Sequence, residues 1–169
     1  MCIRDRSEDF FNAGAAGFAR LSLVGAAGGL AAGLAVARSS LAQGRRIQFW
    51  SAIGIGLSLI FLGTAPSFFL AGVATTLLGA ATAGFQSMNG TLALSAADPA
   101  LHGRVQSLLG LGFSAFGLAS LPLGILADSI GLETTLALMG VVVMIVAVVV
   151  QVIWSKAGPT ETEGSYLAP

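Results

Sequence analysis

The chain has 169 residues, of which 55% are hydrophobic and 9% are charged, and its formal net charge at pH 7 is zero. Soluble domains usually carry about 25% charged residues, so this composition excludes an ordinary soluble domain. Zero net charge argues against a nucleic-acid partner, because such proteins bind phosphates through clustered Lys and Arg.

The long uncharged stretches predict transmembrane helices. Residues 48–97 and 105–127 contain no Asp, Glu, Lys or Arg. Roughly 20 apolar residues in a helix cross a bilayer core of about 30 Å. Strands of a membrane barrel would instead show alternating polarity over segments of about ten residues. Because only a helix satisfies its own backbone hydrogen bonds over such a run in lipid, we expect an all-α integral membrane protein.

In chain order, the polar leader at residues 1–6 is expected to be non-native, because it resembles leaders of reading frames translated from assembled sequence reads. Five hydrophobic segments then predict five transmembrane helices at about 13–37, 49–63, 67–97, 105–127 and 134–154. The stretch ARSSLAQGRR predicts a polar loop between the first two of them. Residues 157–169 are rich in polar residues and predict a disordered cytoplasmic tail.

The basic residues predict the orientation. They lie in the first loop, in the turn after the third segment and in the tail, whereas TAPS and DSIGLE contain none. Cytoplasmic loops of membrane proteins carry an excess of Lys and Arg. We therefore expect a multi-pass protein of the inner (plasma) membrane with its C-terminus in the cytoplasm. Trp50 and Trp154 fall at the same predicted edge, where interfacial aromatic side chains are common.

Small residues predict which helices pack closely, because helices in lipid approach one another through them. We expect the first, third and fourth segments to form an inner set. The Val-rich fifth segment, and less clearly the second, is expected to face lipid. The residues assigned to helix packing or to a kink are Gly25, Gly29, Gly33, Gly117, Pro122 and Gly124.

Polar side chains within apolar segments are candidates for function. Gln86 and Asn89 share a helix face, and they either line a polar cavity or lie hydrated at the inner interface. Arg20 either faces a cavity or extends outward to water, and we favour the second. Phe113 and Phe116 lie on one helix face. Aromatic residues at such positions more often pack against other side chains than contact a ligand. The substrate-cavity candidates are Gln86, Asn89, Phe113, Phe116 and Arg20.

A polar island, DPALHGRVQS at residues 98–107, interrupts the apolar sequence. Asp98 is a suitable N-cap and Pro99 suits the first position of a helical turn, so we expect a short cytoplasmic turn. The residues assigned to the cytoplasmic hinge and loops are Arg38, Arg45, Arg46, His102, Gly103 and Arg104.

The sequence gives little support for a catalytic or metal-binding site. The chain has one His and one Cys, which cannot form a metal cluster by themselves. Asn89-Gly-Thr matches a glycosylation sequon, but it lies in or against a membrane helix. No nucleophile is accompanied by a base and an orienting group. We expect no enzymatic activity, no cofactor and no metal.

Several sequence features follow one another in a characteristic order from the third segment onward. They comprise an Asn late in the third segment, a Pro, a Gly-Arg-Val loop, a Gly-rich helix and a Gly-x-Leu-Ala-Asp-x-x-Gly helix end. The residues are Asn89, Pro99, Gly103, Arg104, Val105, Gly124, Leu126, Ala127, Asp128 and Gly131. In this the chain resembles the C-terminal half of major facilitator superfamily (MFS) transporters, nearest to bacterial siderophore and macrolide exporters. His102 stands where Arg is usual, and GLAVARSSLAQGRR lacks the Asp of the similar loop after helix eight.

The resemblance implies that residues 7–156 are helices eight to twelve of a twelve-helix transporter, a partial MFS fold with helices nine and twelve outermost. Its partners would be the bilayer, the missing N-terminal half and a small amphipathic molecule exported by alternating access. The fragment alone is not expected to transport. An alternative is a small five-helix scaffold or accessory subunit that binds a partner through its Gly-rich helix faces.

Overall fold

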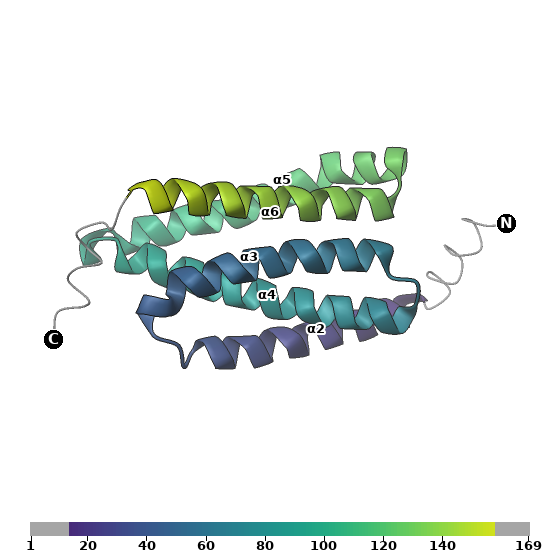
Figure 1. Ribbon diagram of the computed structural model, residues 1–169, viewed down its shortest axis with the longest axis horizontal. Helices are drawn as coiled ribbons and strands as arrows, with labels where there is room; N and C mark the ends of the chain where they lie inside the picture. The colour runs from purple at the N-terminus through teal and green to yellow at the C-terminus, as the bar shows by residue number, and fades with distance from the viewer. Residues whose placement is uncertain (1–13, 158–169) are drawn as a thin grey trace.

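The computed structural model describes residues 14–157, which fold into helices joined by short turns (Figure 1). In chain order the elements are α2 (Gly14–Val36), α3 (Leu41–Thr64), α4 (Phe68–Ser95), the 3-10 helix η1 (Pro99–Leu101), α5 (His102–Ile130) and α6 (Leu132–Ala157). No strand occurs within this described part, so the all-α prediction is confirmed. The leader at 1–6 and the tail predicted at 157–169, apart from Ala157, lie outside the described residues.

The five long helices run roughly along one common axis (Figure 1). α4 packs against both α2 and α3, and α3 packs against α6. α5 makes smaller contacts, with α6 and with the end of α4 that leads into η1. The order of packing is therefore α2, α4, α3 and α6, with α5 the least covered helix of the bundle.

Four of the helices are long and apolar enough to cross a membrane. The candidate spans are Ala19–Val36, Gln43–Thr64, Phe68–Ser95 and Leu132–Lys156. Within α5 the apolar stretch found in this way is shorter and covers Ser120–Ile130. Large apolar side chains, including Val142, Ile145 and Ile153 of α6, are exposed along the outside of the bundle. A surface of this kind fits a protein embedded in a membrane.

The second helix begins earlier than the sequence predicts. We expected it from residue 49, after a loop that contains Arg45 and Arg46, but α3 begins at Leu41. Ser40 has the extended backbone of an N-cap, and Leu, Ala, Gln and Arg in the first two turns are good helix formers. The loop is therefore shorter than predicted, and both arginines extend from helical backbone. Arg38 alone of the loop arginines lies outside a helix, in the turn after α2.

Glycines bring α2 and α4 into close contact. A Cβ atom added at Gly28 would overlap the carbonyl oxygen of Thr76, and one at Gly79 would overlap that of Gly25. A Cβ at Gly29 would lie 3.4 Å from the Gly79 carbonyl oxygen. Gly25 and Gly29 thus lie at this contact, as small residues in membrane helices commonly do.

A second glycine contact joins α3 to α6. A Cβ atom added at Gly140 would lie 2.5 Å from the carbonyl oxygen of Gly56, and one at Gly63 would lie 2.8 Å from that of Glu133. Both helices therefore approach at the level of their backbones. The second hydrophobic segment is consequently a central element of the bundle rather than a peripheral one.

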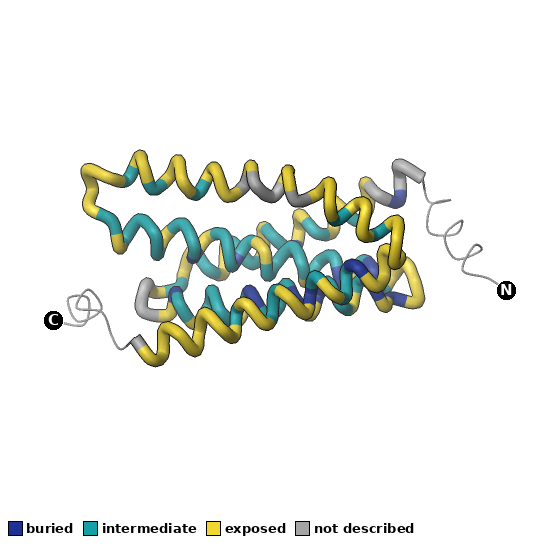
Figure 2. The backbone as a smooth tube through the Cα atoms, turned by 90° about the horizontal axis from the view of Figure 1, so that it is seen from above, coloured by how far each residue is buried: buried dark blue, intermediate teal, exposed yellow. Residues whose placement is uncertain are grey.

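The expectation that the fourth segment belongs to the tightly packed set is wrong for the chain as described. A Cβ atom added at Gly117 or Gly124 of α5 would have no neighbouring atom within 4 Å, and the same holds for Gly33 of α2. A close helix–helix contact needs small residues on both helices at the same level along the bundle. Gly140, the one glycine within α6, already packs against α3. Figure 2 shows α5 as largely exposed.

The ends of α5 follow the sequence signals. The helix continues through Pro122, for which the sequence predicts a kink, and ends at Ile130 with Gly131 as its C-cap. Gly131 has φ 90° and ψ 149°, a region open essentially to glycine alone. The exposed Asp128 lies in the last turn of α5, so the helix-end motif spans the end of the helix rather than a loop.

Candidate functional site

A pair of amide side chains joins α3 and α4 within the apolar part of the bundle. Nε2 of Gln48 donates a hydrogen bond of 3.3 Å to Oδ1 of Asn89, and both side chains are half-buried. The helices approach closely nearby, because a Cβ atom at Gly84 would lie 2.7 Å from Oγ of Ser51. An amide removed from water needs such a partner, since burying it unpaired is unfavourable.

Gln86 lies one turn before Asn89 on α4 and is also half-buried. The sequence singled out Gln86 and Asn89 but missed Gln48, the residue that pairs with one of them. Gln48 stands at the edge of an uncharged stretch, where a hydrated side chain is the ordinary interpretation. Only the antiparallel alignment of α3 and α4 places it opposite Asn89.

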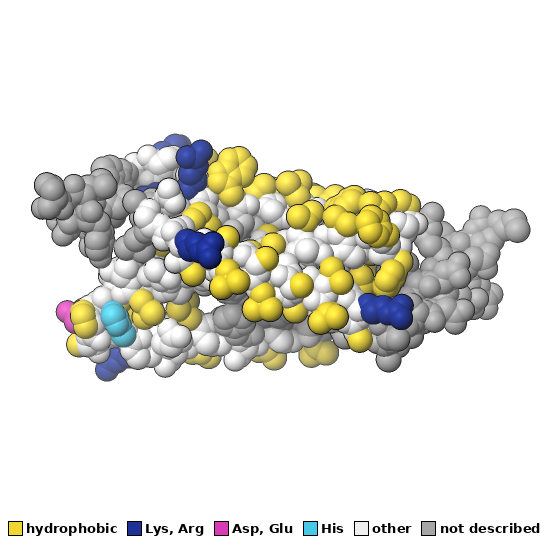
Figure 3. Space-filling view, turned by 90° about the horizontal axis from the view of Figure 1, so that it is seen from below, with side chains coloured by type: hydrophobic (Ala, Val, Ile, Leu, Met, Phe, Trp, Pro, Cys, Tyr) yellow, Lys and Arg dark blue, Asp and Glu magenta, His cyan; other side chains and the backbone are white. Residues whose placement is uncertain are grey.

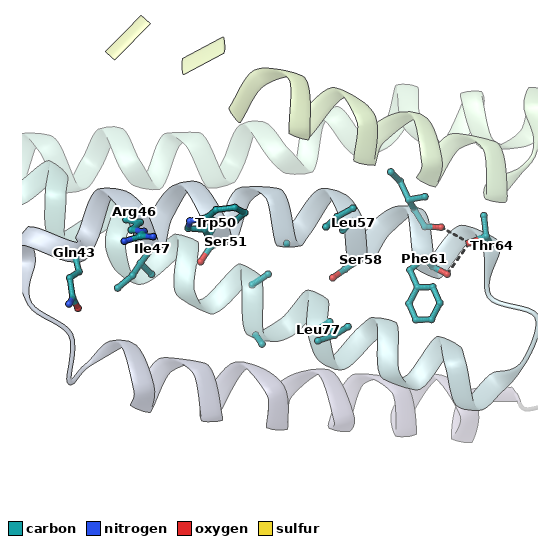
Figure 4. A pocket seen from close by; sticks show the side chains of 14 residues that line it. Gln43, Arg46, Ile47, Trp50, Ser51, Leu57, Ser58, Phe61, Thr64 and Leu77 are labelled. Carbon is teal, nitrogen blue, oxygen red and sulfur yellow. Dashed lines mark hydrogen bonds between the residues drawn. The ribbon is translucent and has the colours of Figure 1, made fainter. Parts of the chain in front are cut away.

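An elongated groove of about 950 Å³ runs along α3 and α4, and neither Gln48 nor Asn89 lines it (Figure 4). Its walls are mostly apolar or small, with polar groups concentrated toward the start of α3. The lining residues are Gln43, Arg46, Ile47, Trp50, Ser51, Gly54, Leu57, Ser58, Ile60, Phe61, Thr64, Leu77, Ala80 and Ala81. At the far end, Oγ1 of Thr64 donates to the carbonyl oxygens of Ile60 and Phe61, so that hydroxyl is used within α3.

A second, smaller hollow of about 310 Å³ lies between α2 and the first turns of α4. Arg20 lines it together with Phe68 and Phe69. The Arg20 side chain is exposed, close to the start of the span that begins at Ala19. This position suits a guanidinium that extends along apolar surface to reach water.

Of the five cavity candidates, the three whose side chains are described are not brought together into one site. Arg20 lies near the start of α2, whereas Gln86 and Asn89 lie toward the other end of the bundle, in the second half of α4 (Figure 1). The side chains of Phe113 and Phe116 lie outside the described residues.

The charged groups divide between the two ends of the bundle. The end that holds the α2–α3 turn, η1 and the end of α6 contains Arg38, Arg45, Arg46, Asp98, His102, Arg104 and Lys156. The other end contains Arg20, Asp128 and Glu133. Figure 3 shows basic side chains near both ends and apolar side chains between them.

At the more basic end, the guanidinium of Arg45 lies over the ring of Trp154, 4.8 Å from its centroid. This cation–π contact ties the first turns of α3 to the last turns of α6. Trp154 is one of the two tryptophans predicted to lie at this edge of the membrane.

The polar island forms a compact turn, as predicted. Oδ1 of Asp98 accepts a hydrogen bond of 2.9 Å from the backbone N–H of Ala100, which makes Asp98 the N-cap of η1. Nε2 of His102 lies 3.2 Å from the carbonyl oxygen of Ala97. Because a carbonyl only accepts, Nε2 is the donor in this bond.

The residues assigned to a loop after this turn are helical. His102, Gly103 and Arg104 lie in the first turn of α5, which begins three residues earlier than predicted, and the Arg104 side chain is exposed. Asp98, Pro99 and the His102 bond therefore lie at the junction between α4 and α5.

Comparison with known proteins identifies no relative. The chain matches no protein-family model, no protein of curated function and no solved structure.

Proposed function

We propose that the chain is the C-terminal half of a facilitator-type secondary transporter that exports a small amphipathic molecule. The observation that carries the proposal is an uncovered glycine stripe on α5. Gly103, Gly110, Gly117 and Gly124 recur every seven residues and are exposed, and a Cβ atom added at any of them would meet no neighbour within 4 Å. A seven-residue repeat keeps small residues on one face of a helix that packs against a nearly parallel partner.

The stripe supports a missing partner because two other glycine clusters of the bundle form close helix contacts. Gly28 and Gly79 join α2 to α4, and Gly56 and Gly140 join α3 to α6. In the proposal, α5 is a fifth crossing whose glycine face packs against the N-terminal half of the same protein. The C-terminus then lies in the cytoplasm, with the more basic end at the inner face of the plasma membrane.

Such transporters work by rocking two halves about a central binding site. In the proposal, the half-buried Gln86, together with the Gln48–Asn89 pair, supplies polar contacts on the C-terminal side of that site. Amide side chains on otherwise apolar helices suit a substrate with both apolar and polar parts.

Arg104 is the candidate hinge residue. It is exposed at the first turn of α5, where a guanidinium is able to bind carbonyl groups at a helix end or a carboxylate of the other half. In the complete transporter, Arg104→Gln is expected to slow export. If this variant left both transport and topology unchanged, Arg104 would not act as a hinge.

The experiment that tests the function measures accumulation of a panel of amphipathic compounds in cells with and without the complete gene. We expect lower accumulation of at least one compound in cells that carry the gene. Gly117→Leu is expected to restore accumulation at an unchanged protein level, because Leu fills the face on which the other half packs.

Gly112→Leu is the matched control, because Gly112 is also open but points about 140° away around the helix. It is expected to leave export intact. Equal accumulation with and without the gene, or a coding sequence that supplies only these five segments, would instead favour the scaffold alternative.

A further inference from the structure

The groove on α3 and α4 opens to the surface along its length. Trp50, Leu57 and Leu77 line it, and 60%, 55% and 52% of their respective surfaces are exposed. In a membrane this surface meets lipid. The groove is concave because Gly54, Ala80 and the neighbouring Ala81 leave space between larger side chains.

The two ends of the groove differ in charge. Arg46 and Gln43 lie at one end, beside Trp50, whereas Phe61 and the internally bonded Thr64 lie at the other (Figure 4). None of the residues that line the groove is acidic. The groove therefore offers a cation and an amide at one end of a long apolar channel.

The part of the groove between Arg46 and Leu57 matches the depth of one leaflet of a bilayer. A helix rises about 1.5 Å per residue, so Arg46 and Leu57 lie about 16 Å apart along α3. Half of a bilayer core of about 30 Å is about 15 Å. A lipid whose headgroup lies at Arg46 would thus extend an acyl chain past Gly54 to the level of Leu57.

We propose that this groove is a binding site for an anionic phospholipid. The phosphate-bearing headgroup accepts hydrogen bonds from Arg46 and Gln43, and one acyl chain lies along Gly54 and Ala80. An anionic lipid is preferred to a zwitterionic one, because Arg46 complements the net negative charge of an anionic headgroup. In a zwitterionic headgroup the lipid's own cationic group already balances the phosphate. Neither Gln48 nor Asn89 lines this site, which requires membrane embedding but no transport activity.

The test uses the position of Trp50, one of the two tryptophans in the chain. In the Trp154→Phe variant, Trp50 is the single tryptophan, and lipids with brominated acyl chains quench its fluorescence on contact. The chain is reconstituted in vesicles of equal molar phosphatidylglycerol and phosphatidylcholine. Two preparations are compared, which differ only in which of the two lipids carries bromine, so surface charge is constant.

Brominated phosphatidylglycerol is expected to quench Trp50 more strongly, with a relative association of about fivefold, the effect of one basic residue near a membrane surface. Arg46→Gln is expected to bring the ratio close to one. Arg38→Gln, which removes an equal charge from the same end but outside the groove, is expected to keep the preference. Equal quenching in the parent, or equal loss in both variants, would overturn the proposal.

A neutral variant tests the shape of the site. Ala80→Leu fills the groove from α4 without changing charge, and helical content by circular dichroism verifies that the chain stays folded. The preference for phosphatidylglycerol is expected to fall at least twofold. An unchanged preference would show that Arg46 attracts headgroups without any acyl chain lying in the groove, and would overturn the proposal.

Discussion

Gln48 on α3 donates a hydrogen bond of 3.3 Å to Asn89 on α4, across the face on which the two helices meet. The bond links residues 41 positions apart in the chain, so it forms only once the helices are packed.

The pair is expected to contribute modestly to stability. Polar pairs between membrane helices average about 0.6 kcal/mol of coupling, with a maximum of about 1.7 kcal/mol. We expect a double-mutant cycle with Gln48→Leu and Asn89→Leu to give a coupling within that range, measured from unfolding of the detergent-solubilised chain. Ser87→Ala, on an exposed face of α4, is the control and should change stability little. Additive effects of the two substitutions would contradict a direct bond.

The α2–α4 contact predicts opposite outcomes for two glycines of one helix. Gly28→Ala places a Cβ against the Thr76 carbonyl, and such overpacking is expected to destabilise the chain by about 1–3 kcal/mol. Gly33→Ala has open space and removes a flexible residue from a helix, so it is expected to stabilise by about 0.5–1 kcal/mol. Thermal unfolding in detergent measures both. A shift of the unfolding temperature in the same direction for both variants would contradict the α2–α4 contact.

The turn between α5 and α6 depends on a single backbone conformation. Gly131 has φ 90°, which side chains rarely permit, so Gly131→Ala is expected to destabilise by about 1–3 kcal/mol. Hydrogen exchange at the α5–α6 turn should rise in this variant. Gly124→Ala, two helical turns earlier and at ordinary φ, should leave exchange at the turn unchanged.

The contact between Arg45 and Trp154 is expected to hold the last turns of α6 against α3. An exposed cation–π pair contributes about 0.5–1 kcal/mol, so Trp154→Leu should raise hydrogen exchange over the final two turns of α6. Trp50→Leu serves as the control, because Trp50 lines the groove instead. Unchanged exchange in Trp154→Leu would show that α6 is held without this pair.

The helical class and most of the turns can be predicted from the amino-acid sequence alone. Uncharged apolar runs in lipid have only helical solutions, and Ser67, Asp98 and Gly131 mark helix ends through local chemistry. The N-terminal limit of α3 was missed, because charged residues such as Arg46 signal a loop by polarity and yet favour helix by propensity.

Which glycines lie at helix contacts depends on how the helices pack and cannot be predicted from the sequence. Gly28 and Gly117 both lie in glycine-rich apolar segments. A Cβ atom added at Gly28 would overlap the backbone of α4, whereas one at Gly117 would have no neighbour within 4 Å in the described chain. Helix packing also pairs Asn89 with Gln48 and places Arg46 at the end of a groove. The physical reason is that hydropathy and capping act within a few residues, whereas a contact depends on the height and rotation of two helices that are distant in sequence.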